Sequence, residues 1–322
     1  MVLEHSHLKE NKTIEISGSK SISNRLLILH QLFDNILIQN LSNSQDTQLL
    51  QAALQSDSDI IDIHHAGTAM RFLTSYYAIQ EGKTVVLTGS ERMKQRPIKF
   101  LVDALRDLGA EISYLENEGF PPLKISGKKI LKSTVRIPAN ISSQFITSLM
   151  LIGAKLENGL QIKLEGTVTS KPYLEMTLKI LRTVGINNHW EGNVIKIQPN
   201  IHTEKHSQSI PFVVESDWSS ASYYYSLAAI SRKTINLKWF KQFSLQGDSR
   251  IKEIYWKFFG VNTISEGAES RISLLPEHYF QFPEKIVLNM NDCPDIAQTL
   301  CVTATSLKIP FEITGLETLK IK

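Results

Sequence analysis

Cysteine is scarce in this sequence: only Cys293 and Cys301 are present, and neither lies in a CxxC pair or in a His/Cys group with metal-ligand spacing. This scarcity excludes a disulfide framework and argues against a zinc site. Long hydrophobic runs are also missing, because no apolar stretch approaches the roughly 18 residues that a membrane-spanning helix needs. The N-terminal segment MVLEHSHLKENK lacks the apolar core of a signal peptide. We therefore expect a cytoplasmic protein that neither binds a metal nor enters a membrane.

An excess of charge of either sign is lacking too. The 35 Lys and Arg residues nearly balance the 32 Asp and Glu residues, which leaves a net charge of +3. This balance is too even to indicate a nucleic-acid-binding protein, so the basic side chains must act locally. The 322 residues suffice for two domains, and an apolar content of 42% supplies packed cores, which excludes disordered and fibrous proteins.

What the sequence does contain is an internal repeat. Small or polar residues precede apolar helical stretches at intervals of 75, 77 and 75 residues, at Gly67, Ser142, Ser219 and Pro294. A second series of helix starts follows in phase at intervals of 75 and 77 residues, at Arg96, Lys171 and Asp248. A repeat of this length indicates one supersecondary unit that is copied along the chain.

Each copy predicts two helices and several short strands. β-rich runs such as 84–89 and 160–166 separate the paired helices, and a shorter copy occupies residues 13–66. The helical stretches are apolar on nearly all sides, which is typical of helices buried beneath sheets, so we expect compact α/β domains rather than an open solenoid. Because the last copy ends at Lys322, where a helix should begin, we expect a C-terminally truncated version of a longer protein, with a natural end at an edge strand as the alternative.

The segment SGSKSISNR at 17–25 forms a small-residue loop that leads into a helix and carries Lys20 and Arg25. Exposed amides at a helix N-terminus point toward negative charge, and Lys and Arg add full positive charge. The segment therefore predicts an anion-binding loop, with a simple helix cap as the alternative. Its sequence does not fit the phosphate-binding loop GxxxxGK[ST].

Further cations and a glycine suited to close approach follow along the chain. The 92–97 loop RMKQRP places three basic residues, including Arg96, directly before a helix, with a solvated charge run as the alternative. Gly67 opens another helix, where a ligand can approach the backbone closely. His64 and His65 are neighbours that point to opposite faces of an extended segment, so we expect surface or packing histidines rather than a metal pair.

Two more helix starts carry uncharged or acidic polar groups. Ser142, Ser143 and Gln144 make a neutral donor set suited to a phosphate or a polyol, with a plain N-cap as the alternative. Asp295 opens an otherwise apolar helix. There it is either a capping carboxylate or a general acid or base whose proton affinity is set by neighbouring cations and burial.

Together these segments closely resemble the EPSP synthases (3-phosphoshikimate 1-carboxyvinyltransferases) of the enolpyruvyl transferase family. The resemblance runs in order from residue 13 to residue 322. The motifs that carry it are GSKSISNR at 18–25, AGTAMR at 66–71, RMKQRP at 92–97, SSQF at 142–145, SKPY at 170–173, VESDWSSASY at 214–223, QGDSR at 246–250 and NMNDCPDIAQT at 289–299.

The resemblance implies an enolpyruvyl-transferase fold, of α/β (α+β) class, in which units of two helices and a four-stranded sheet are arranged in two domains. One complete domain of three units would span residues 19–213. The segments 1–18 and 214–322 would form a second domain that lacks its last unit.

The resemblance also implies the chemistry. The family transfers the enolpyruvyl group of phosphoenolpyruvate to the 5-hydroxyl of shikimate 3-phosphate and releases phosphate, in aromatic amino acid biosynthesis, without a cofactor or a metal. We expect these two anionic metabolites as partners, rather than nucleic acid or a membrane, and we expect a monomer. Because a catalytic Glu and further Arg residues of the family would follow Lys322, we expect weak ligand binding and little or no turnover from the chain itself.

Residue by residue, the resemblance assigns proton handling to Lys20 and Asp295. The shikimate 3-phosphate contacts that it implies are Lys20, Ser21, Arg25, Ser142, Ser143, Gln144, Ser170, Tyr173, Asp295 and Lys322. The phosphoenolpyruvate contacts that it implies are Lys20, Gly67, Arg96 and Gln144.

Two alternatives stay open. UDP-N-acetylglucosamine enolpyruvyl transferases share the fold, but they carry Lys-Asn after the first strand and a reactive loop Cys. This sequence instead has Lys20-Ser21, and its 92–97 loop contains no Cys. The other alternative is a non-catalytic phosphate-binding or RNA-binding repeat module. The basic residues are not interleaved with aromatic residues as a nucleic-acid surface requires, which argues against this alternative.

Overall fold

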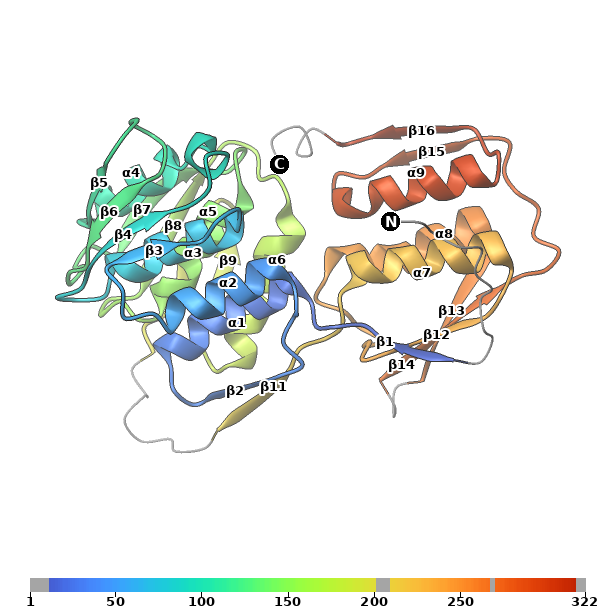
Figure 1. Cartoon of the computed structure of the whole chain (residues 1–322), viewed down its shortest axis with the longest axis horizontal. Helices are drawn as coiled ribbons and strands as arrows, with labels where there is room; N and C mark the ends of the chain where they lie inside the picture. The colour runs from blue at the N-terminus through green and yellow to red at the C-terminus, as the bar shows by residue number, and fades with distance from the viewer. Residues whose placement is uncertain (1–11, 201–208, 267–269, 317–322) are drawn as a thin grey trace. The chain divides into compact units, whose positions relative to one another are not determined.

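The computed structural model describes residues 12–200, 209–266 and 270–316. Its contacts divide the chain into two compact units (Figure 1). We call Lys20–Val214 the inserted unit, and Met1–Ser19 with Glu215–Lys322 the flanking unit. Both units mix helices with short strands, so the α/β class predicted from the repeat is confirmed. Within the described ranges, no helix is both long and apolar enough to cross a bilayer.

The helices of the inserted unit begin where the repeat predicts them. They are α1 (Lys20–Leu32), α2 (Gln45–Leu54), α3 (Gly67–Ala78), α4 (Lys99–Leu108), α5 (Ser143–Gly153) and α6 (Lys171–Thr183), with a 3-10 turn, η1 (Met93–Gln95), before α4. The strands between them are β2 (Ile36–Gln39), β3 (Ile60–Asp62), β4 (Thr84–Thr88), β5 (Glu111–Tyr114), β6 (Leu123–Ser126), β7 (Thr134–Pro138), β8 (Leu160–Glu165), β9 (Asn188–Glu191), β10 (Val194–Ile197) and β11 (Ile210–Val213).

Two four-stranded sheets of the inserted unit share one topology. Their strand orders are β3-β4-β6-β5 and β7-β8-β10-β9. In each sheet the first pair is parallel, as in the registers Ile60↔Val86 and Val135↔Ile162, and the other two pairs are antiparallel. The internal repeat in the sequence thus corresponds to a repeated sheet and its helices.

The earliest copy differs from the expected four-stranded sheet. Among the described residues its sheet consists of β2 paired in parallel with β11, in the register Ile36↔Ile210. Pro211 lies in β11 and has no N–H to donate, which is compatible with the edge of a sheet rather than its centre. The strand that completes this pair therefore comes from far along the chain rather than from the copy itself.

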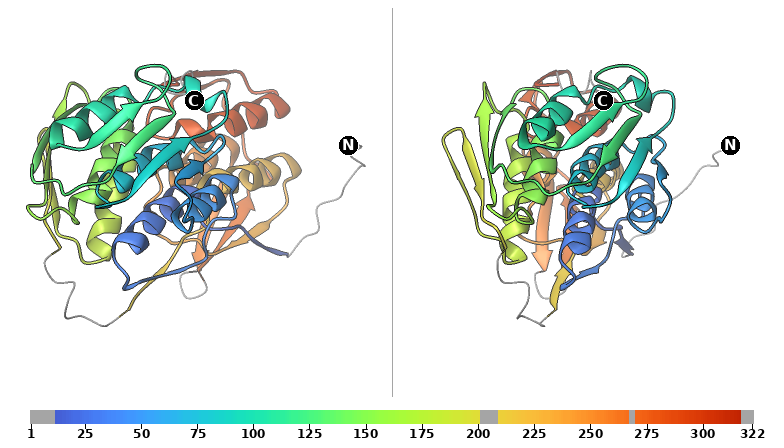
Figure 2. Two further views of the ribbon diagram at one scale, coloured as in Figure 1. Left: turned by 60° about the vertical axis from the view of Figure 1, so that its left-hand side comes forward. Right: turned by 90° about the vertical axis from the view of Figure 1, so that its left-hand side faces the viewer.

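Helices α3 and α5 form the core of the inserted unit, where they pack against each other (Figure 2). Nearly every residue of both helices is buried, and apolar burial contributes about 25 cal/mol per Å². Their polar groups are satisfied internally: Ser148 donates to the carbonyl of Arg71 at 2.7 Å and shares a hydrogen bond with Ser75. These contacts join the middle of α3 to the middle of α5.

The flanking unit repeats the same topology. Its elements are β1 (Thr13–Glu15), α7 (Trp218–Ser231), β12 (Ile235–Lys238), the 3-10 turn η2 (Gly247–Arg250), α8 (Ile251–Phe259), β13 (Val261–Glu266), β14 (Arg271–Pro276), β15 (Ile286–Asn289), the 3-10 turn η4 (Pro294–Ile296), α9 (Ala297–Ser306) and β16 (Phe311–Thr314). The sheet order is β1-β12-β14-β13, again with a parallel first pair, and β15 pairs in parallel with β16. Its core is rich in buried aromatic side chains, including Trp218, Tyr225 and Tyr255.

The chain passes between the two units twice, after Ser19 and after Val214. The two passages are hydrogen-bonded to each other, because the amide of Ser19 donates to the carbonyl of Glu215 at 2.8 Å. The Glu215 carboxylate is buried and accepts a hydrogen bond from Trp218 Nε1 at 2.8 Å. The inserted unit is therefore an insertion that begins and ends at adjacent points of the flanking unit.

Candidate active site

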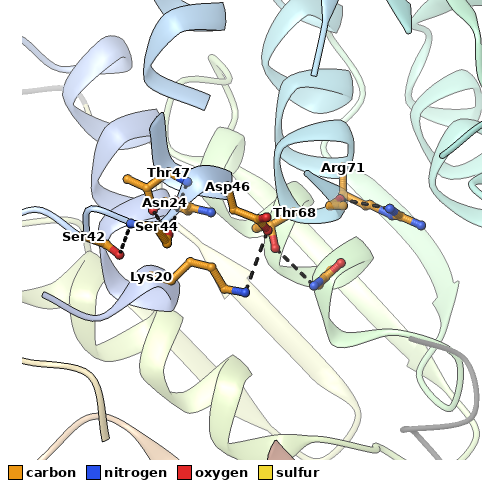
Figure 3. A network of polar contacts seen from close by, with 10 residues as sticks. Lys20, Asn24, Ser42, Ser44, Asp46, Thr47, Thr68 and Arg71 are labelled. Atoms are coloured by element: carbon orange, nitrogen blue, oxygen red, sulfur yellow. Dashed lines mark hydrogen bonds and ion pairs between the residues drawn. The ribbon is translucent and has the colours of Figure 1, made fainter. Parts of the chain in front are cut away.

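Lys20 is the first residue of α1, and its half-exposed side chain lies beside the start of α2 (Figure 3). Its Nζ is 3.8 Å from Oδ2 of Asp46, which belongs to the first turn of α2. Sequence reasoning missed Asp46, because one acidic residue at a helix start is typical of ordinary capping. The structure shows a carboxylate placed next to the predicted catalytic lysine.

Gly67 and Arg96 lie against each other, although 29 positions separate them in the sequence. A Cβ at position 67 would be only 2.9 Å from Cζ of Arg96, so glycine is what lets the guanidinium approach the start of α3. Burial lowers the pKa of Arg96, and the carboxylate of Asp46 opposes that shift. Two of the four residues predicted for phosphoenolpyruvate are thus in direct contact.

A second arginine, Arg71, supports this pair from behind. Its guanidinium is buried and donates to the carbonyl of Gly67 at 3.0 Å and to that of Pro97 at 3.3 Å. Burial lowers the pKa of Arg71 to about 9, with a further lowering from the nearby Arg96. Sequence reasoning did not select Arg71, yet its position one helical turn after Gly67 was the available signal.

The start of α5 joins the same group of residues. Ser142 is the N-cap, and its hydroxyl accepts from the amide of Gln144 at 3.3 Å, so this hydroxyl caps α5 at the place where the donor set was predicted. Ser143 follows as the first, half-buried residue of α5. The Gln144 side chain donates from Nε2 to Oγ1 of Thr68 at 3.3 Å, which links the starts of α5 and α3.

Arg25 connects the predicted shikimate 3-phosphate residues of α1 and α6. Its Nη1 donates to the carbonyl of Ser21 at 2.7 Å, its Nε to Oγ1 of Thr177 at 2.8 Å and its Nη2 to the carbonyl of Tyr173 at 3.4 Å. The side chain is only 4% exposed, and burial lowers its pKa to about 10. Ser170, in the left-handed conformation, precedes α6. The Arg25 guanidinium therefore joins α1 to α6, in addition to its predicted contact with shikimate 3-phosphate.

The starts of α1, α2, α3 and α5 accordingly meet in the inserted unit, as Figure 3 shows for the first three. Helix N-termini present amide donors and a partial positive charge, which favour phosphate and carboxylate groups. Lys20 and Arg96 add two full charges to that arrangement. The geometry can hold an anion with at least two negatively charged groups.

Asp295 lies in the flanking unit, in the 3-10 turn η4 that leads into α9. The Asp295 side chain is half-buried. Its carboxylate and those of Asp248 and Asp292 each raise the pKa of the neighbouring Cys293 thiol. Burial, followed by Asp248, raises the pKa of the Cys293 thiol to about 12, so the thiol stays protonated and unreactive at neutral pH. Lys322 lies outside the described residues.

The described part of the chain holds no group of three or more His, Cys, Asp and Glu side chains that could bind a metal ion. His64 and His65 are exposed, and the amide of His64 donates to Oδ1 of Asp62 at 2.7 Å in a turn. Both lie in a turn, with His64 in the left-handed region, rather than in the extended segment expected from the sequence, and their exposure is that of surface histidines.

Comparison with known proteins identifies relatives along nearly the whole chain. A family profile described as EPSP synthase (3-phosphoshikimate 1-carboxyvinyltransferase) matches residues 49–322. The protein named 3-phosphoshikimate 1-carboxyvinyltransferase from Bacteroides fragilis (strain YCH46) is 45% identical over 96% of this chain and 74% of its own length. The protein of that name from Haemophilus influenzae (strain PittGG) is 36% identical over 91% of this chain and 72% of its own length.

Solved structures show the same architecture. EPSP synthase from Acinetobacter baumannii superimposes with a TM-score of 0.66 at 19% identity, covering 91% of this chain and 71% of that one. The enolpyruvyl transferase NikO from Streptomyces tendae gives a TM-score of 0.65 at 10% identity, covering 94% and 74%. These structures confirm the predicted enolpyruvyl-transferase fold. Taken with the profile match and the identity to the two bacterial relatives, they lead to one conclusion: the chain belongs to the EPSP synthase family.

Proposed function

We propose that this protein transfers the enolpyruvyl group of phosphoenolpyruvate to the 5-hydroxyl of shikimate 3-phosphate, with release of phosphate. The observation that carries the proposal is the meeting of helix starts in the inserted unit, where Lys20 and the pair Gly67–Arg96 lie near the amides of α3 and α5. Membership of the EPSP synthase family supports the same reaction.

The charges fit the electrostatic problem of this reaction. Both substrates are anions, and their repulsion must be offset before the reacting atoms can meet. Opposite unit charges about 4 Å apart attract by ~1 kcal/mol in water but by ~4 kcal/mol at an effective dielectric of 20. Lys20 and Arg96 therefore bind phosphoenolpyruvate most effectively when water is excluded from the site.

The bond changes require only proton handling and orientation. The 5-hydroxyl oxygen bonds to C2 of phosphoenolpyruvate while the hydroxyl proton is removed and C3 gains a proton. The resulting tetrahedral adduct then loses a proton from C3 as the C2–O bond to phosphate breaks. We assign these proton transfers to Lys20 and Asp295, and proximity of the two substrates can lower the barrier by roughly 7–11 kcal/mol.

Shikimate 3-phosphate is assigned to the hydroxyl and amide groups around the starts of α1, α5 and α6. The residues are Ser21, Arg25, Ser142, Ser143, Gln144, Ser170 and Tyr173, with Lys20 and Gln144 shared between the two substrates. Hydroxyl, amide and guanidinium donors suit a phosphate and a polyol on one ligand. Asp295 and Lys322 complete the proposed set.

Titration calorimetry tests the proposal, first with shikimate 3-phosphate and then with phosphoenolpyruvate added to the saturated protein. We expect both to bind, and Lys20→Met to weaken each by roughly tenfold or more, which corresponds to about 1.4 kcal/mol. The matched control is Lys128→Met, because Lys128 is equally exposed, pairs with Glu111 at 3.7 Å and is bonded through its amide to Ala78, at the end of α3 opposite the site. Its affinities should be unchanged.

The competing functions give different results in the same experiment. Binding of UDP-N-acetylglucosamine in place of shikimate 3-phosphate would favour the related transferase. Salt-sensitive RNA binding with no heat from shikimate 3-phosphate would favour a non-catalytic binding module. Either outcome would refute the proposed reaction.

A further inference from the structure

The carboxylate of Asp46 is an unexpected feature of a site that must bind anions. It lies 3.8 Å from Nζ of Lys20, and it is close enough to Arg96 to counteract the effect of burial on that guanidinium. Both cations are assigned to phosphoenolpyruvate under the proposed function. A negative charge at this point repels the anionic substrate, so a useful role of this carboxylate must be one toward the two cations that bind the substrate.

The fold holds Asp46 in place through the junction of α1 and α2 (Figure 3). Ser44 caps α2 by accepting from the amide of Thr47. The hydroxyl of Thr47 donates to Oδ1 of the buried Asn24 at 2.8 Å, and the amide of Ser42 donates to a hydroxyl of α1 at 2.9 Å. Buried hydrogen bonds therefore fix the first turn of α2, and with it Asp46, onto the start of α1.

The two side chains differ in how firmly they are held. The Asp46 side chain is 21% exposed, whereas that of Lys20 is 48% exposed. The Lys20 ammonium group is also carried on a flexible stem of four carbons. An ion pair with this exposure adds little to the free energy of folding. Its effect is to restrict the directions that the Lys20 ammonium group samples.

We propose that Asp46 is a positioning residue that aligns the Lys20 ammonium group, relative to the neighbouring Arg96, for phosphoenolpyruvate. The inference rests on the proposed function, since it assigns the two cations to that substrate. Phosphoenolpyruvate carries a carboxylate and a phosphate at a fixed separation, so it binds best to cations at a matching separation. A single small anion needs positive charge but not that spacing.

The proposal predicts effects of opposite sign for two anions. In Asp46→Asn, phosphoenolpyruvate added with saturating shikimate 3-phosphate should bind roughly tenfold more weakly, because the Lys20 ammonium group loses its alignment relative to Arg96. Inorganic phosphate alone should bind about twofold or more tightly, because the site becomes more positive. Shikimate 3-phosphate affinity should stay within about twofold, and Asp46→Glu should recover most of the phosphoenolpyruvate affinity.

The matched control is Asp103→Asn, which removes a carboxylate from the exposed Lys99–Asp103 pair of the same unit. It should leave all three affinities and the urea unfolding midpoint unchanged. Phosphoenolpyruvate binding that is unchanged or tighter in Asp46→Asn would overturn the inference. So would equal losses for both substrates together with a lowered unfolding midpoint, since these indicate a structural role.

Failure of the proposed function is recognised separately. If the unaltered chain gives no heat with shikimate 3-phosphate, the assignment of the reaction fails, whatever the variant does. The titration with inorganic phosphate alone still tests Asp46 in that case, and an affinity that Asp46→Asn does not increase would overturn the inference.

Discussion

Gly67 shows how one missing side chain shapes the candidate site. The start of α3 lies against the guanidinium of Arg96, where a Cβ has no room, while Arg71 holds the Gly67 carbonyl from the other side. Backbone amides and a full positive charge can thus reach the same ligand group. The absence of a side chain is what makes this close approach possible.

Gly67→Ala should therefore displace the Arg96 guanidinium and weaken phosphoenolpyruvate binding roughly tenfold, or about 1.4 kcal/mol, with little effect on shikimate 3-phosphate. Calorimetry on a double-mutant cycle checks the cause. In an Arg96→Met background the added methyl group meets no guanidinium, so the same change should cost much less. Equal losses in both backgrounds would contradict this explanation.

At the scale of single residues, the sequence indicates the polar groups of the site but not all of their tasks. Lys20, Gly67 and Arg96 were predictable because helix starts with cations or glycine suit anions. Asp46 was not, since a carboxylate opposes that pattern, and the one signal for the buried Arg71 was its position one helical turn after Gly67. Their importance depends on contacts made across the fold.

Arg25 acts at the scale of secondary-structure elements. Its buried guanidinium binds the backbone of α1 at Ser21, the buried hydroxyl of Thr177 and the backbone of α6 at Tyr173. Hydrogen bonds from a charged donor contribute about 1.5–3 kcal/mol each when they remain buried. The relative placement of the two helix starts thus depends on one side chain.

Arg25→Met should lower the free energy of unfolding of the unliganded protein by about 2–3 kcal/mol, in addition to any loss of ligand binding. Urea unfolding without substrate measures the effect. Arg106→Met is the control, because Arg106 also donates to a backbone carbonyl, that of Ile112, but from an exposed position. A stability of Arg25→Met equal to that of the control would show that the junction does not need the guanidinium.

The elements themselves were largely predictable, whereas some pairings were not. α3 and α5 begin at Gly67 and Ser143, as their small and polar residues predict, and α4 ends at Gly109 in the left-handed conformation expected of a terminating glycine. The pairing of β2 with β11 joins segments some 170 residues apart. No local pattern encodes such a contact, because it depends on how the intervening copies fold.

At the scale of the whole molecule, the two units have separate cores. Ile16, at the N-terminal end of the flanking unit, is 8% exposed and packs in a core formed otherwise by residues after position 215. A short N-terminal segment thus completes a core that the sequence assembles much later. The stability of the flanking unit should depend on that segment.

Ile16→Ala should destabilise the flanking unit by about 2–4 kcal/mol through loss of apolar contact and the cavity left behind. Tryptophan fluorescence during urea unfolding reports mainly on this unit, which contains Trp218, Trp239 and Trp256. Hydrogen exchange in α5 should stay unchanged, and Ile137→Ala in the inserted unit should give the reverse pattern. Equal effects on both units would show that they unfold together.

The insertion also sets an order of events on the ribosome. Strand β1 pairs with β12 in the register Thr13↔Asn236, so the strand must wait for a partner made 223 residues later. At roughly 5–20 residues per second, synthesis of that stretch takes about 11–45 s, ample time for Lys20–Val214 to fold first. During that interval the segment of β1 has no partner on the nascent chain, and the charges of Glu15 and of Lys12, directly before the strand, discourage premature association with other strands.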